Sequence, residues 1–73
     1  MKYIVPKGTE VVRVDPSMPY PSAETLITLK DVMYSEKDII STLNTTVCFS
    51  LPKDAAPWKH IIVRLSDLQE VYE

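Results

Sequence analysis

The sequence predicts a small, mainly β domain, a partly open barrel of about five strands with one or two short helical turns. Valine, isoleucine and threonine supply 20 of the 73 residues, and their branched side chains suit a pleated sheet better than a helix. Several short runs alternate apolar and polar residues, which is the period of a strand. Prolines cluster at 16–21 and 52–57, and because proline cannot donate to a sheet ladder, these clusters mark connections between strands.

Five segments show the pattern of a strand, and the first two are separated by a Pro-Lys-Gly-Thr turn at 6–9. The predicted strands are 2–5, 10–14, 25–30 (reaching 34 at the furthest), 46–51 and 59–65. The proline-rich stretch 15–24 is predicted to be a loop. From the alternation we expect a core formed by Ile4, Val12, Val14, Ile27, Leu29, Val47, Phe49, Ile61, Val63 and Leu65.

Two serines begin the predicted helical turns. Ser35 precedes acidic residues and an apolar face, which predicts a turn over 36–43. Ser66 and Gln69 have the spacing of a capping box, which predicts a turn over 67–71. An alternative α+β fold has a helix near 22–33 that is capped by Ser22, although the branched residues at 25, 27 and 28 argue against it.

Length and composition limit the chain to one domain, residues 1–73. Apolar residues make up 45% of it and the net charge is −2, so the composition is that of a folded chain rather than a disordered one. A single cysteine, Cys48, cannot form an internal disulfide, and a secreted domain of this size usually needs several. The N-terminus has no stretch of signal-peptide length, and no run is long enough to span a membrane. We therefore expect a cytoplasmic protein.

The chain has few of the residues that enzymes and metal sites need. Gly8 is its one glycine, whereas a phosphate-binding loop needs several. His60 and Cys48 are its one histidine and one cysteine, and a closed zinc site takes four ligands. We therefore predict a protein that is not an enzyme, with no catalytic residues, no metal and no cofactor. A Cys48–His60 pair on neighbouring strands is the remaining catalytic arrangement.

Aromatic side chains beside prolines are the better candidates for function. Tyr20 lies between two prolines with Met18 close by, and Trp58 follows Pro57. Large side chains of this kind dominate protein-binding surfaces. The predicted partner-binding residues are Met18, Tyr20, Trp58 and His60. The structural alternative has Trp58 closing one end of the barrel, with Tyr20 folded back onto it, and His60 as a plain surface residue.

The run 58–71, with its Val-x-Leu-x-Asp-Leu pattern, and the opening Lys7-Gly8-Thr9 turn before a valine-rich strand resemble small SH3-like barrels. The resemblance covers about a third of the chain and implies an SH3-like, partly open barrel. The acidic, tyrosine-rich loop and paired tryptophans of peptide-binding SH3 domains are missing, so their recognition of proline motifs does not carry over. The glycine-rich pattern of ribosomal barrels is missing too. In its small size the chain is similar to bacteriophage accessory proteins that bind a host protein.

These observations favour a non-enzymatic protein-interaction module, such as a phage-encoded inhibitor or adaptor of a host protein. Two alternatives remain. A nucleic-acid-binding barrel would use the scattered cations Lys2, Lys7, Lys53, Lys59 and Arg64, although the chain has no basic run. A homo-oligomeric structural subunit would instead join copies through unpaired strand edges.

Overall fold

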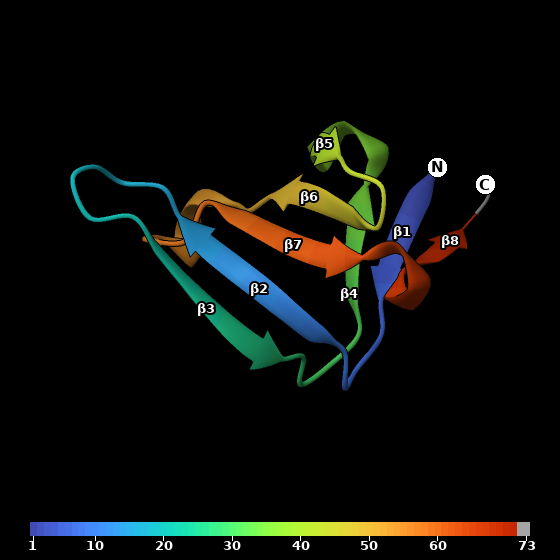
Figure 1. Ribbon diagram of the computed structural model, residues 1–73. Coiled ribbons are helices and arrows are strands. Elements are labelled where there is room, and N and C mark those ends of the chain that lie inside the picture. The colour runs from blue at the N-terminus through green and yellow to red at the C-terminus, as the bar shows by residue number, and fades with distance from the viewer. Residues whose placement is uncertain (72–73) are drawn as a thin grey trace.

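The computed structural model describes residues 1–71, which fold into two antiparallel sheets that pack against each other (Figure 1). The smaller sheet has three strands, in the order β4 (Val32–Ser35), β1 (Lys2–Val5) and β8 (Gln69–Val71). The larger has five, in the order β3 (Ser22–Ile27), β2 (Glu10–Asp15), β7 (His60–Arg64), β6 (Thr46–Ser50) and β5 (Ile39–Thr42). The prediction of a mainly β fold is confirmed, and the sheets are not closed into a barrel.

The helical segments within residues 1–71 are three short 3-10 turns: η1 (Glu36–Asp38), η2 (Lys53–Ala55) and η3 (Leu65–Asp67). Short helical turns were expected near the first and the last of these. None of the helical segments in this part of the chain has the length and apolarity that crossing a membrane would require.

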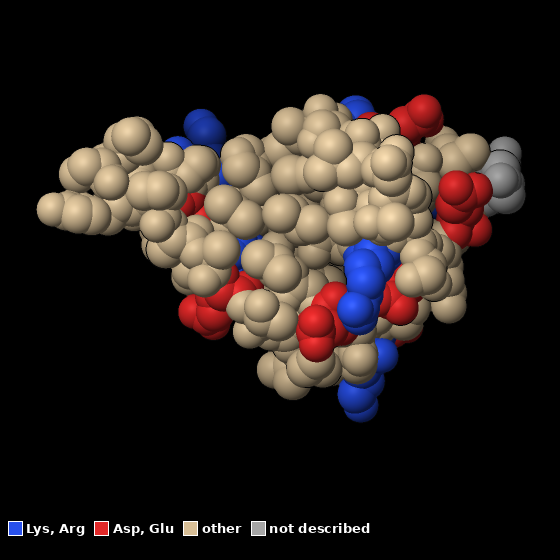
Figure 2. All heavy atoms as spheres, in the orientation of Figure 1, with Lys and Arg blue, Asp and Glu red and all other residues tan. Residues whose placement is uncertain are grey.

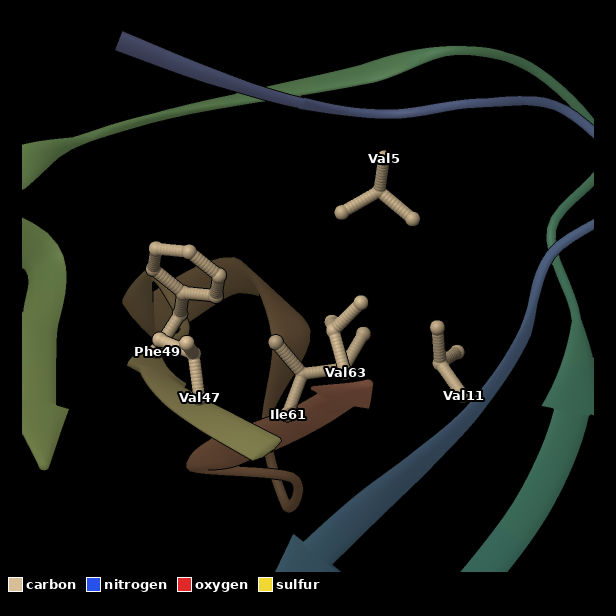
Figure 3. Close-up of a cluster of buried hydrophobic side chains, with 6 residues drawn as sticks. All are labelled: Val5, Val11, Val47, Phe49, Ile61 and Val63. Carbon is tan, nitrogen blue, oxygen red and sulfur yellow. The ribbon is translucent and has the colours of Figure 1, made fainter. Parts of the chain in front are cut away.

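Six apolar side chains form the core between the two sheets, and each is at most 8% exposed (Figure 3). They are Val5, Val11, Val47, Phe49, Ile61 and Val63. Phe49 on β6 contacts the smaller sheet directly, because the ring of Tyr34 on β4 stacks on it at a centroid distance of 4.7 Å. The centroid of Tyr3 on β1 lies 5.9 Å from the same ring. Aromatic packing therefore joins the sheets.

The core prediction is confirmed on β6 and β7 and is wrong on β2. Val11 points inward and is 1% exposed, whereas Val12 and Val14 are half-buried on the opposite face of the sheet. The segment Val11-Val12-Arg13-Val14 has valine on both faces, so alternation alone does not indicate which one is buried. Arg13 lies on the same face as Val11, but its side chain is partly exposed and pairs with Glu24 instead of entering the core.

The remaining residues expected in the core are not buried, and they lie near or beyond the ends of strands. On β1, Val5 is fully buried and the predicted Ile4 only half-buried. Ile27, Leu29 and Leu65 are exposed, with 51%, 86% and 43% of their surface accessible. Ile27 ends an edge strand, and Leu29 and Leu65 lie outside the strands.

Strand boundaries in the middle of the chain also differ from the prediction. The segment predicted as a strand over 25–30 forms β3 at Ser22–Ile27, followed by a separate β4, so the helix near 22–33 is not formed. The helical turn predicted over 36–43 ends at Asp38, because Ile39 already pairs with Phe49 of β6. The turn predicted over 67–71 is η3 followed by β8, whose residues pair with β1.

Two connections leave the five-stranded sheet at the same end. β2 ends at Asp15 and β3 begins at Ser22, while β6 ends at Ser50 and β7 begins at His60. Val14 pairs with His60 in the ladder between β2 and β7, so the start of the connection 16–21 lies beside the end of the connection 51–59. The backbone N–H of Lys59 donates to the Val14 carbonyl at 2.9 Å and fastens the second connection to β2. We call this region, residues 16–21 and 51–59 with His60, the loop end.

Candidate protein-binding surface

The connection 16–21 projects from the loop end and carries the two most exposed predicted site residues (Figure 1). Met18 is 83% exposed and Tyr20 is 85% exposed. The connection has the sequence Pro-Ser-Met-Pro-Tyr-Pro and no charged residue. The projection on the left of Figure 2 shows no charged side chain on its visible face. It therefore presents an apolar and aromatic surface to solvent.

A local hydrogen-bond pair fixes the start of this connection. The backbone N–H of Ser17 donates to Asp15 Oδ1 at 3.1 Å, and the Ser17 hydroxyl donates to the same oxygen. An aspartate that accepts from the residue two positions on forms an Asx turn. The hydrogen bonds from Ser17, first from its side chain and then from its backbone, hold the pKa of the Asp15 carboxyl below its ordinary value, and Lys59 adds a smaller electrostatic contribution.

Tyr20 does not fold back onto Trp58, because a ring that is 85% exposed packs against little of the domain. Trp58 is half-buried in the second connection, where its backbone N–H donates to the Ala55 carbonyl at 3.1 Å. The guanidinium carbon of Arg13 lies 4.4 Å from the centre of the indole ring, a cation–π contact. Arg13 is itself held by Glu24, at 2.7 Å between Nη2 and Oε1. These contacts fix the tryptophan ring at the loop end, beside Arg13 of β2.

His60 is the first residue of β7 and alternates with the buried Ile61, so its side chain lies on the outer face of the sheet. It is half-buried, and among the described residues its Nδ1 atom is buried without a hydrogen-bond partner. Cys48 is half-buried on β6 and pairs with Ile62 rather than with His60. Burial raises the pKa of the Cys48 thiol, which reduces its thiolate fraction and its reactivity.

The second connection curls around a hollow of about 520 Å³. Four apolar residues line it, Leu51, Pro52, Ala56 and Trp58, together with four polar ones, Ser50, Lys53, Lys59 and His60. This volume lies in the range of pockets that hold small ligands or a few side chains of a partner. The structure therefore brings Trp58 and His60 into one hollow and places Met18 and Tyr20 on the neighbouring projection.

Sequence reasoning missed Lys53 and Lys59 as members of this hollow. The signal for them is weak, because it consists only of two lysines on either side of an Ala-Ala-Pro-Trp segment within one connection.

In residues 1–71, no group of three or more histidine, cysteine or acidic side chains is arranged to share a metal ion. No protein-family model matches the chain, and comparisons with curated proteins and with solved structures found no match either.

Proposed function

We propose that this protein is a non-enzymatic protein-interaction module and that the loop end is its contact surface. The observation that carries the proposal is the exposure of Met18 and Tyr20 on an uncharged projection. Tyrosine buries a large apolar area and keeps a polar group at its tip, and it is enriched among residues that dominate binding energy. Methionine adds an adaptable apolar contact. A partner would bury surface that now faces water.

The backbone of the connection 16–21 is also restrained in the free protein. Three of its six residues are proline, each with a fixed φ angle, and the Asx turn at Asp15 holds its first residues. A segment that is already ordered loses less conformational entropy on binding. This supports recognition by a preformed loop.

The same proposal includes the finer expectation of an inhibitor or adaptor that binds a host protein in the cytoplasm, of the kind that bacteriophages encode. An 8.3 kDa chain can act by covering the surface of another protein, which needs no enclosed active site. The free thiol of Cys48 is compatible with a reducing compartment.

Nucleic-acid binding has less support. Lys53 and Lys59 line one hollow, but Arg64 lies at the opposite end of β7, where its Nε atom donates to Asp67 at 3.0 Å. A cation that is already paired gains less from a phosphate. The free edges of β3 and β5 would serve a homo-oligomer, and sedimentation of the purified chain tests that alternative.

Affinity capture from a lysate of the natural host tests the proposal. We compare the wild-type chain with Met18→Ala, Tyr20→Ala and a matched control, Leu43→Ala. Leu43 is 70% exposed and lies between β5 and β6, at the end of the sheet opposite the loop end. We expect the wild type and the control to retain the same specific protein, and Tyr20→Ala to retain about tenfold less of it, as losing a dominant contact would cause.

Folding of each variant is checked by its thermal midpoint, because exposed substitutions of this kind change stability by no more than about 0.5 kcal/mol. The proposal fails if the folded Tyr20→Ala and Met18→Ala variants capture the same protein in the same amount as the wild type. It also fails if the wild type retains nothing specific.

A further inference from the structure

We propose that the hollow under the 51–59 connection binds an acidic segment of the partner protein, with one apolar side chain seated against Trp58. The carboxylates on either side of that side chain would lie near Lys53 and Lys59. This inference rests on the proposed function and names the chemistry of the partner at the same loop end.

The apolar part of the lining accounts for the seated side chain. It consists of Leu51, Pro52, Ala56 and Trp58, around a volume of about 520 Å³. Arg13 lies over the indole ring at 4.4 Å and holds it in place, so the ring need not be ordered on binding. A preformed apolar pocket binds an apolar side chain at a low entropic cost.

The two lysines of the lining account for the acidic flanks. Lys53 and Lys59 line the hollow, and no carboxylate lines it. Neither ammonium group takes part in an ion pair or hydrogen bond within residues 1–71. Asp15 acts on Lys59 from a distance, since its carboxyl responds electrostatically to that lysine. Two lysines that form no ion pair within residues 1–71, in a lining that is half apolar, are complementary to a segment with carboxylates beside an apolar residue.

A polyanion such as nucleic acid fits this surface less well. Binding of nucleic acid scales with the number of phosphates that the protein neutralises, and this hollow offers two lysines. Half of the lining is apolar and has no role in contacting a phosphate backbone. The observations therefore favour a short acidic peptide.

Intrinsic fluorescence offers a direct test, because Trp58 is the one tryptophan of the chain. We titrate the full chain with three capped pentapeptides, Glu-Asp-Leu-Asp-Glu, Glu-Asp-Ser-Asp-Glu and Lys-Lys-Leu-Lys-Lys, and with a single-stranded dT octamer. The acidic leucine peptide is expected to change Trp58 emission saturably. Its serine counterpart is expected to bind about tenfold more weakly, since a buried leucine side chain contributes roughly that much or more. The basic peptide and the octamer are expected to have no effect.

A charge-reversal pair identifies the lysines. The double variant Lys53→Glu/Lys59→Glu is expected to bind the acidic leucine peptide about tenfold more weakly and to gain affinity for the basic peptide, since two favourable charge pairs become repulsive. The control is Lys30→Glu/Lys37→Glu, which makes the same change in net charge at exposed positions away from the hollow. We expect the control to bind as the wild type does.

The inference is overturned if the acidic leucine peptide leaves Trp58 emission unchanged at concentrations up to about 1 mM, which would detect even a weak complex. Equal weakening by both charge-reversal pairs, or a response to the dT octamer in place of the peptide, overturns it as well. These outcomes are separable from failure of the proposed function. A capture that depends on Tyr20 while the peptide does not bind overturns this inference and leaves the interaction module standing. Peptide binding with no captured protein supports the acidic-segment pocket and overturns the interaction module.

Discussion

Tyr34 of the three-stranded sheet stacks on Phe49 of the five-stranded sheet, with ring centroids 4.7 Å apart and ring planes 14° from parallel. Phe49 is fully buried and also contacts Tyr3. The two sheets therefore share one aromatic centre. In a chain of 73 residues, which buries only about 60% of the surface of its unfolded form, much of the stability depends on this centre.

Replacing Phe49 with alanine is expected to destabilise the domain by about 3–5 kcal/mol, because the change removes a large buried ring and leaves a cavity between the sheets. That loss is comparable to the whole stability of a small domain, so the variant should be largely unfolded at room temperature. Phe49→Leu should lose less. Urea unfolding followed by circular dichroism measures both, with the exposed Leu43→Ala as the control. A Phe49→Ala variant with the wild-type midpoint would contradict a shared aromatic centre.

Strands were predictable where a buried face was marked by strong apolar residues at every second position. The predicted strands 46–51 and 59–65 correspond closely to β6 and β7, Thr46–Ser50 and His60–Arg64. Prediction failed at the edges of the sheets. All but one of the residues of β3 are exposed, so no buried face marks where it begins and ends, and its position is fixed by pairing with β2 from Glu10 to Asp15. Pairing of this kind is a tertiary effect.

The short strands β5 and β8 were hidden by local signals for helix. Ser35 is the expected cap of the first turn, and its N–H donates to Asp38 Oδ2 at 3.1 Å, but this supports only one 3-10 turn. The capping box predicted for Ser66 and Gln69 is not formed, because η3 begins at Leu65 with Arg64 at its cap position. The candidate site, too, was predictable only in part. The prolines around Tyr20 indicated an exposed loop, whereas the hollow depends on how residues 51–59 fold back, which periodicity does not show.

A buried pair of threonines links the turn 6–9 to the connection between β3 and β4. Thr28 Oγ1 donates to the Pro6 carbonyl at 2.7 Å and accepts from the Thr9 N–H at 2.9 Å. Thr28→Val keeps the shape of the side chain but leaves that buried N–H without a partner, so we expect a loss of about 1–3 kcal/mol. Thr28→Ser should lose less, because it keeps the hydroxyl.

Urea unfolding also measures this pair of variants, and Thr25→Val on the exposed face of β3 serves as the matched control. We expect the control to stay within about 0.5 kcal/mol of the wild type. If Thr28→Val and Thr25→Val had equal midpoints, the hydroxyl of Thr28 would have no structural role.

The Asx turn at Asp15 makes the projecting loop sensitive to acid. Hydrogen bonds from Ser17 lower the pKa of the Asp15 carboxyl in the folded chain, so the ionised carboxylate favours the folded loop. That contribution is complete above the ordinary pKa of aspartate, about 3.9, and is lost as the pH falls through the lowered value. Ser17→Ala removes the side-chain donor and should raise the pKa of Asp15 towards its ordinary value. NMR titration of the carboxyl carbon measures the change, and Ser22→Ala is the control; an unshifted titration in Ser17→Ala would refute the assignment.

Gly8 has a φ angle of +84°, in the left-handed region that residues with a Cβ atom rarely adopt. An added Cβ would meet no atom within 4 Å, so the effect of Gly8→Ala is confined to the backbone. We expect a loss of about 1–2 kcal/mol, and a smaller one for Gly8→Asn, because asparagine tolerates this region better. The neighbouring Lys7→Ala, at an exposed position of the same turn, is the control for thermal and urea unfolding.

Gly8 also donates its N–H to the Thr28 carbonyl at 2.9 Å. Strain at this turn should therefore lower the hydrogen-exchange protection of residues 6–9 and 28 together, and unchanged protection in Gly8→Ala would show that the turn accepts a side chain freely.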